Sequence, residues 1–257
     1  MAILFTDLDS TLIYSHQRDI GEDKVLVERL DGREQSFMTK KAYTYLKEAD
    51  WLKVVPVTAR TKEQYSRIFS IGKPLPAERA IICYGGELLI NGEEDSQWHE
   101  ETMKLVRDEI PSVSRSYEKL IKLTDPAHVY FPAPYLCYAV CENVEELAAT
   151  LREDGEITSG ADVICDGRKM YCLANSINKG RAIERYRTRF GKEKCAAAGD
   201  SGFDIPMLMQ ADAALAADRI FDDISGREVY ALGSGEISDM ICDILERLRT
   251  RGFFESE

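Results

Sequence analysis

Two hydrophobic patterns alternate at both ends of the chain. Short unbroken apolar runs indicate strands that are buried on both faces, as in a parallel sheet. These runs cover residues 2–5, 54–57, 80–83, 195–198 and 213–217. Amphipathic segments that predict helices follow most of them, at residues 40–49, 62–71, 179–190, 205–210 and 236–249. The alternation of strand and helix predicts an α/β fold with a parallel sheet.

The middle of the chain has a different pattern. Hairpin signals at Asn91-Gly92 and within residues 162–173 mix with helical segments at residues 101–123 and 144–153. Pro111 could interrupt the first of these helices. Hairpins mixed with helices predict a separate α+β unit. We therefore expect an α/β core from residues 1–84 and 177–257, with an α+β insert at residues 85–176.

Turn and boundary residues add detail to the core. Asp31-Gly32 lies between residues 25–30 and residues 33–38 and predicts a hairpin with a type I′ turn. Pro56 would require an edge or irregular position in its strand. Thr39 and Thr61 are expected to begin helices, and Pro74 and Pro76 to follow the end of the second one.

The first strand ends in two carboxylates, Asp7 and Asp9. In an extended backbone their side chains point the same way, and like charges so close need a cation or a shared proton. Ligands of α/β sheets usually bind at the carboxyl ends of strands. The pair suggests a Mg²⁺-dependent phosphoryl-transfer site in which one carboxylate attacks phosphorus. A turn or helix cap is the alternative interpretation.

Other strand ends carry complementary groups. Thr58 and Arg60 follow the second strand, Asp200, Ser201 and Asp204 follow the strand at residues 195–198, and Lys179 begins a helix. If these strands are parallel neighbours, their groups converge on one sheet edge. Together they would supply a nucleophile, a proton donor, metal ligands and donors for phosphoryl oxygens.

Composition narrows the class of partner and the location. The chain has 257 residues and a formal net charge of −12, from 33 basic and 45 acidic residues. That charge argues against nonspecific binding to nucleic acid or to an anionic membrane, but it permits a small phosphorylated substrate. Seven cysteines without Cys-x-x-Cys spacing indicate reduced thiols. With no apolar span and no signal peptide evident, we expect a cytoplasmic protein.

Four ordered motifs resemble those of the haloacid dehalogenase superfamily. They are Asp7-Leu-Asp-Ser-Thr11, Thr58-Ala-Arg60, Asn178-Lys-Gly180 and Gly199-Asp-Ser-Gly-Phe-Asp204. The insert between the second and third motifs resembles the cap of the Cof-like and sucrose-phosphate-phosphatase-like branch. The resemblance covers nearly the whole chain and implies a Rossmann-like catalytic core with a mobile α/β cap that sets substrate specificity.

The resemblance also implies roles for single residues. Asp7 would be the nucleophile that forms an aspartyl-phosphate, and Asp9 the general acid and base, with its backbone carbonyl on Mg²⁺. Thr58 and Lys179 would bind the phosphoryl group. Asp7, Asp9, Asp200 and Asp204 would form the Mg²⁺ site, and Thr11, Ala59 and Arg60 would contribute to the phosphate- and substrate-binding loops.

One departure from the family pattern keeps alternatives open. Phe203 stands where asparagine is common, so a polar contact in the metal or phosphate shell would be missing or supplied elsewhere. The leading hypothesis is a phosphatase of a small metabolite, such as a sugar phosphate. A sugar phosphomutase and a catalytically silent binding relative are the alternatives, and a dehalogenase is disfavoured by Asp9. The candidates for substrate specificity are Arg168, Lys169 and Tyr171 in one hairpin, and Gly85, Gly86 and Glu87 after the crossing from core to insert. The sequence is compatible with both a monomer and a homodimer.

Overall fold

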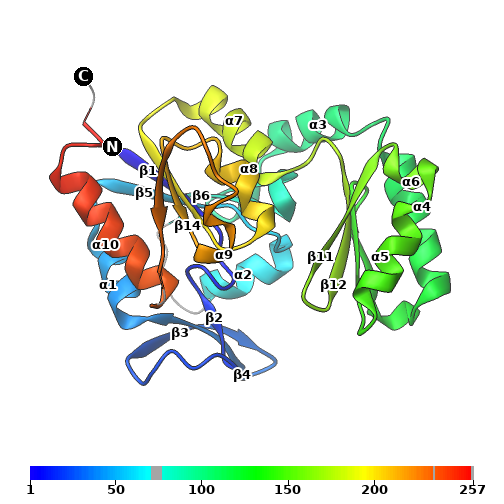
Figure 1. The fold of residues 1–257 in the computed structure, drawn as a ribbon, viewed down its shortest axis with the longest axis horizontal. Coiled ribbons are helices and arrows are strands. Elements are labelled where there is room, and N and C mark those ends of the chain that lie inside the picture. Colours follow the sequence, from blue (N-terminus) through cyan, green and yellow to red (C-terminus); the bar gives the residue numbers. More distant parts are fainter. Residues whose placement is uncertain (71–76, 234, 256–257) are drawn as a thin grey trace. The chain divides into compact units, whose positions relative to one another are not determined.

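The chain forms two compact units in a computed structural model that describes residues 1–70, 77–233 and 235–255. The first unit joins Met1–Asp95 to Asn178–Glu257, and the second comprises Ser96–Ile177 (Figure 1). Because β7 (Glu87–Ile90) pairs with β6 (Arg79–Ile82), residues 85–95 belong to the first unit and not to the insert in which the sequence analysis placed them.

A parallel five-stranded sheet organises the first unit. Its strands run in the order β15-β14-β13-β1-β5. They are β1 (Ala2–Thr6), β5 (Leu52–Pro56), β13 (Cys195–Gly199), β14 (Ala213–Ala216) and β15 (Glu228–Ala231). Every neighbouring pair is parallel, and β1, β13 and β14 are buried throughout. The predicted α/β class with a parallel sheet is therefore confirmed. Pro56 ends β5 at the sheet's edge, where a residue without an N–H is tolerated.

Helices follow the strands, as the pattern predicts. They are α1 (Lys40–Glu48), α2 (Lys62–Ser70), α7 (Lys179–Phe190), α8 (Ile205–Leu208), α9 (Asp218–Phe221) and α10 (Ile237–Thr250). Thr39 caps α1 by accepting a hydrogen bond from the Ala42 N–H. Gly191 ends α7 with a φ of 115°, which suits glycine. The predicted end of α2 at Ile71, with Pro74 and Pro76 beyond it, lies outside the described residues.

Two small antiparallel sheets complete the first unit. One has the order β2-β4-β3, from β2 (Tyr14–Ser15), β3 (Lys24–Leu30) and β4 (Arg33–Thr39). Asp31 and Gly32 both have positive φ, at 50° and 78°, which fits the predicted type I′ turn. The other sheet is β6-β7-β8, with β8 at Glu93–Glu94.

The second unit is the predicted α+β unit. Its sheet has the order β11-β12-β10-β9, with β9 (Val129–Ala133), β10 (Leu136–Val140), β11 (Ala161–Asp166) and β12 (Lys169–Ala174). The helices are α3 (Ser96–Leu105), α4 (Ile110–Leu123), α5 (Val144–Arg152) and α6 (Gly155–Thr158), and α4 and α5 cover one face of the sheet (Figure 1). The single helix considered for residues 101–123 is two helices. Pro111 lies in the first turn of α4, where its missing N–H costs nothing. No helix in the described residues has the length and apolarity needed to cross a membrane.

Candidate active site

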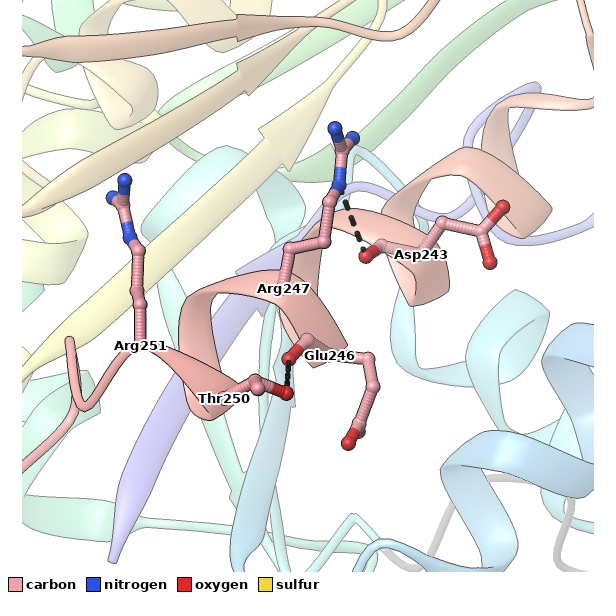
Figure 2. Close-up of a pocket in the computed structure, with 5 residues that line it drawn as sticks. All are labelled: Asp243, Glu246, Arg247, Thr250 and Arg251. Atoms are coloured by element: carbon pink, nitrogen blue, oxygen red, sulfur yellow. Dashed lines mark hydrogen bonds between the residues drawn. The ribbon is translucent and has the colours of Figure 1, made fainter.

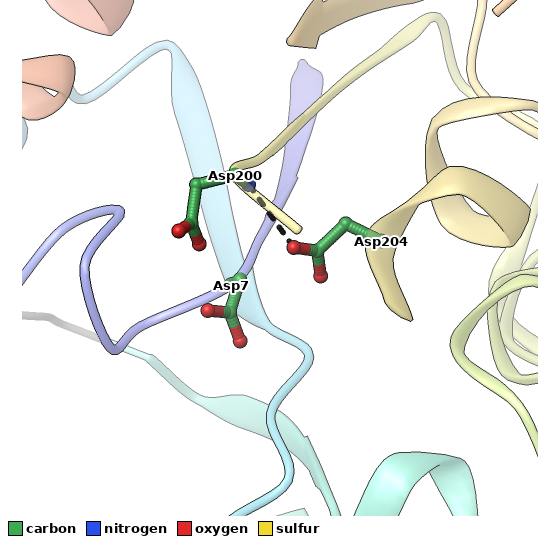
Figure 3. Close-up of side chains that lie close together, drawn as sticks. All are labelled: Asp7, Asp200 and Asp204. Carbon is green, nitrogen blue, oxygen red and sulfur yellow. Dashed lines mark hydrogen bonds between the residues drawn. The ribbon is translucent and has the colours of Figure 1, made fainter. Parts of the chain in front are cut away.

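Three carboxylates converge at the carboxyl end of the parallel sheet. Asp7 follows β1, and Asp200 and Asp204 lie in the loop after β13; one oxygen from each falls within 4.8 Å of the others (Figure 3). The Asp7 N–H donates to the Ala198 carbonyl at 2.9 Å, which extends the ladder between the two central strands. All three side chains are buried. The predicted convergence of strand ends is therefore present for these residues.

Lys179 connects two of the carboxylates. Its Nζ lies 2.6 Å from Asp7 Oδ1 and 2.6 Å from Asp204 Oδ1, and the side chain is almost fully buried. Lys179 is the first residue of α7, and the Asn178 side chain caps that helix by accepting from the Arg181 N–H at 2.9 Å. The cap fixes where the helix begins and so places the lysine beside Asp7.

The loop after β13 is tightly bonded around Asp204. Its Oδ2 accepts from the Asp200 N–H and the Ser201 N–H, both at 3.0 Å, and from the Ser201 hydroxyl at 3.1 Å. With Oδ1 on Lys179, both oxygens of Asp204 are engaged. A Cβ at Gly199 would lie 2.3 Å from the Asp204 Cβ, so only glycine permits this packing. Asp204 therefore fixes the loop and orients Lys179.

Asp200 has two further partners from other elements. The Thr11 hydroxyl donates to its Oδ1 at 2.9 Å, which places Thr11 as a support of the site. Arg219, in α9, donates to its Oδ2 and to its backbone carbonyl. Arg219 is not among the predicted site residues, although a cation shortly after the strand at residues 213–217 follows the same strand-end pattern as the others.

Burial dominates the electrostatics of the cluster. It raises the pKa of Asp7 to about 8; the charge of Lys179 opposes this, and the charges of Asp204 and Asp9 add to it. Burial and the charge of Asp204 likewise raise the pKa of Asp200. Burial alone would lower the pKa of Lys179, but the charges of Asp204 and Asp7 outweigh it and raise that pKa. The cluster thus carries more negative charge than its lysine offsets.

Asp9 forms a separate pair with Arg60. The Arg60 Nε and Nη2 donate to the two Asp9 carboxylate oxygens, each at 2.8 Å. Asp9 is 58% exposed, whereas the Arg60 side chain is 11% exposed. Arg60 also contacts the buried Glu28 of β3, which the sequence analysis placed in a hairpin without assigning it a role. A charged residue directly after the apolar run Val25-Leu26-Val27 was the signal available for it.

Thr58 occupies the same sheet edge as Asp7. Thr6 pairs with Pro56, and these are the last residues of the neighbouring strands β1 and β5. Thr58 therefore leaves the sheet at the same edge as Asp7. Thr58 is fully buried, and its hydroxyl accepts from the Arg60 N–H at 3.2 Å. The half-buried Ala59 lies between these two residues. Thr58 therefore shapes the loop that carries Arg60.

Phe203 makes an aromatic contact in place of a polar one. Its ring lies 5.2 Å from that of Tyr84, between centroids, in a tilted arrangement. Tyr84 follows β6 with a positive φ of 58°, and its N–H donates to the Thr58 carbonyl at 3.0 Å. The contact joins the loop after β13 to the segment after β6, which is itself hydrogen-bonded to the loop after β5.

The candidate specificity residues of the second unit differ in accessibility. Arg168 pairs with Glu142 at 2.6 Å, with both side chains exposed. The Tyr171 ring is buried and lies 5.6 Å from the ring of Tyr138. In the first unit, a Cβ at Gly85 would lie 2.6 Å from the Ala182 Cβ of α7, so Gly85 serves close packing.

A shallow pocket elsewhere contains none of the predicted site residues. It lies along α10 and its end (Figure 2) and is lined by Asp243, Glu246, Arg247, Thr250 and Arg251. Two of these side chains, Arg247 and Thr250, bond to backbone carbonyls one turn earlier in the same helix. We therefore locate the candidate site at the carboxylate cluster.

Comparison with known proteins identifies the family of the chain. The family model described as sucrose-6F-phosphate phosphohydrolase matches residues 1–216. No curated protein sequence matches the chain significantly.

Solved structures share the fold across nearly the whole chain. The sucrose-phosphatase of Synechocystis sp. PCC6803, solved with sucrose and phosphate, is 18% identical with a TM-score of 0.65; the match covers 99% of this chain and 98% of that one. A Thermoplasma acidophilum protein is 13% identical with a TM-score of 0.62, over 97% and 98% of the two chains. A Bacteroides thetaiotaomicron phosphatase of the haloalkanoate (HAD) superfamily is 14% identical with a TM-score of 0.58, over 97% and 95%.

Proposed function

The chain belongs to the sucrose-6F-phosphate phosphohydrolase family of haloacid dehalogenase-type phosphatases, and on that premise we propose that it hydrolyses a small sugar phosphate with Mg²⁺ through an aspartyl-phosphate on Asp7. The predicted superfamily and the predicted phosphatase class are confirmed by the family match. The substrate, the metal and the residue roles are our proposal.

The observation that carries the proposal is the buried carboxylate cluster. Asp7, Asp200 and Asp204 present one oxygen each within 4.8 Å, and Lys179 lies beside two of them. Burial raises the pKa of Asp7 and of Asp200. The raised values indicate that the nearby cations do not fully offset the negative charge of the cluster. Hard divalent cations prefer carboxylate oxygens, so the donor set fits Mg²⁺. Such a cation would stabilise the charge on the transferring phosphoryl group.

The proposed ligands of Mg²⁺ are the side chains of Asp7 and Asp200 and the backbone carbonyl of Asp9. Both oxygens of Asp204 are already hydrogen-bonded, which favours an indirect role for it through Lys179. Its predicted role as a direct ligand stays a prediction. Lys179 would hold the Asp7 carboxylate in place and offset charge on the phosphoryl oxygens.

The proposed reaction has two steps with balanced proton transfers. Asp7 attacks phosphorus and the ester oxygen leaves with a proton from Asp9. Water then attacks the phosphorus of the aspartyl-phosphate, returns a proton to Asp9 and frees Asp7 and phosphate. Thr58 would donate to a phosphoryl oxygen, with Thr11, Ala59 and Arg60 supporting the loops around it.

The family and the Synechocystis sucrose-phosphatase, solved with sucrose and phosphate, support a sugar phosphate as substrate. We propose that the first unit is the catalytic core and the second the specificity cap, with Arg168, Lys169 and Tyr171 as candidates for substrate contact. A cytoplasmic location also stays a prediction.

Phosphate release from a panel of sugar phosphates, including sucrose 6F-phosphate, tests the proposal. We expect turnover with Mg²⁺, loss of turnover with chelator, and a decrease on the order of 10³-fold or more in Asp7→Asn. Asp212→Asn is the matched control: Asp212 is a partly buried carboxylate at the opposite end of β13, where it accepts from the Cys195 N–H at 2.9 Å, and it should retain activity.

Equal release by wild type and Asp7→Asn would contradict the proposed nucleophile. No release from any sugar phosphate would contradict the substrate class. Net isomerisation of a sugar phosphate without phosphate release would favour the phosphomutase alternative.

A further inference from the structure

A bulge in β3 turns a carboxylate toward the interior. The pairing of β3 with β4 shifts register on both sides of Glu28. Alternation along a regular strand would send Val27 and Glu28 to opposite faces, yet they are 1% and 0% exposed. Bulges commonly redirect a side chain beside a functional site. The hairpin is therefore shaped to bury Glu28.

Glu28 is held by three donors. Its Oε2 accepts from Arg60 Nη2 at 3.0 Å and from the Ser36 hydroxyl at 2.6 Å, and its Oε1 accepts from Arg67 Nε at 3.0 Å. Burial by itself raises the pKa of Glu28, but the hydrogen bond and charge of Arg60, with Ser36 and Arg67, lower it overall. Glu28 is thus a buried, ionised anchor.

The Arg60 guanidinium is shared between two carboxylates. Its Nη2 donates to both Glu28 and Asp9, its Nε donates to Asp9, and its Nη1 donates to the Gln64 carbonyl at 3.3 Å. Asp9 is mostly exposed, and the negative charge of Asp9 acts on Asp7. With Glu28 and the Gln64 carbonyl on its interior side, Arg60 offers Asp9 a fixed partner.

We propose that Glu28 is a positioning residue: it anchors Arg60, and Arg60 in turn fixes the orientation of the Asp9 carboxylate, two residues after Asp7, for proton transfer. The inference rests on the proposed function, because it needs Asp9 to act as acid and base. Two separated parts of the chain contribute. The hairpin provides the anchor, and the loop after β5 provides the arginine.

Kinetics of Glu28→Gln test the inference with a chromogenic phosphoester and Mg²⁺. If the Asp9 carboxylate is misplaced, proton transfer slows but no substrate contact is lost. We therefore expect kcat to fall about 10- to 100-fold while KM changes less than about twofold. Because Glu28 would act through Arg60, Glu28→Gln should add no further loss of kcat in an Arg60→Ala background.

Asp95→Asn is the matched control. It removes one carboxylate from a partly buried bidentate pair with Arg189, at 2.7 and 2.9 Å, in the same unit. We expect it to keep the wild-type kcat. Thermal unfolding of every variant separates loss of fold from loss of rate.

The outcomes separate the two claims. No Mg²⁺-dependent turnover by wild type would overturn the proposed function. An active wild type with an unchanged kcat in Glu28→Gln, or losses that add fully to those of Arg60→Ala, would overturn the positioning role. If Glu28→Gln does not fold, Ser36→Ala weakens the same anchor. A two- to fivefold lower kcat, of the order one hydrogen bond supplies, would support the role, and an unchanged kcat would contradict it.

Discussion

At the scale of single residues, the site buries more negative charge than positive charge. Lys179 lies 2.6 Å from both Asp7 and Asp204, while Asp200 relies on Thr11 and Arg219. Burying a charge is costly unless it is paired, and here carboxylates outnumber the buried lysine. Such a cluster lowers the stability of the fold, as is common at functional sites.

Asp7→Asn should therefore stabilise the chelator-treated protein in a pH-dependent way. The folded-state pKa of Asp7, about 8, exceeds an unfolded value of about 3.9, so wild type loses stability as pH rises between these values. Asparagine removes this loss. Linkage between these two pKa values corresponds to about 5–6 kcal/mol above pH 8, so we expect a gain of several kcal/mol at pH 9 and little at pH 4. Urea unfolding at both pH values checks this, and a gain that is the same at both would contradict it.

At the scale of elements, the site is set by where helices and loops begin. The loop after β13 and the start of α7 meet so closely that a Cβ on Gly180 would lie 2.4 Å from the Pro206 carbonyl oxygen at α8. Asn178 caps α7, and Lys179 takes its place from that cap. Close contact between α7 and α8 thus keeps the lysine against both carboxylates.

Gly180→Ala should push α7 and α8 apart. Alanine gains up to about 1 kcal/mol in helix propensity, but the clash is with backbone and should cost about 1–3 kcal/mol. We expect a net loss of stability and lower phosphatase activity. In Gly155→Ala, at the start of α6, the new Cβ meets nothing within 4 Å. Thermal melts and kcat of both variants test the idea, which fails if Gly180→Ala is as stable and active as Gly155→Ala.

Local signals explain which elements could be predicted from the sequence. The Asp31-Gly32 turn, the Thr39 cap and the Gly191 stop each act within a few residues, and each is present as predicted. The boundary at Asp95, where the first segment of the first unit ends, depends instead on the pairing of β7 with β6. Hairpin signals at Asn91-Gly92 gave no indication of which sheet the strand would join.

The same distinction applies to the site. Strand-end position was enough to predict that Asp7, Asp200 and Asp204 would converge, because parallel strands end at one edge. The pairing of Asp9 with Arg60, and of Arg60 with Glu28, joins residues far apart in the chain through specific side-chain geometry. Periodicity carries no information about such contacts, so the role of Glu28 emerged only from the structure.

At the scale of the whole molecule, the chain combines a parallel-sheet unit with an α+β unit inserted into it. All three clustered carboxylates and Lys179 belong to the parallel-sheet unit, on segments from both sides of the insertion. Assembly of the carboxylate cluster thus requires the two segments of that unit to fold together.

The central claim is that Asp7 carries the phosphoryl group during turnover. Its most direct test is acid quenching of the magnesium-loaded enzyme during turnover of a phosphoryl-labelled sugar phosphate, followed by mapping of the label on the protein. We predict label on the peptide that contains Asp7, and neither label nor turnover in Asp7→Asn. Turnover by Asp7→Asn, or label on a different residue, would contradict the account.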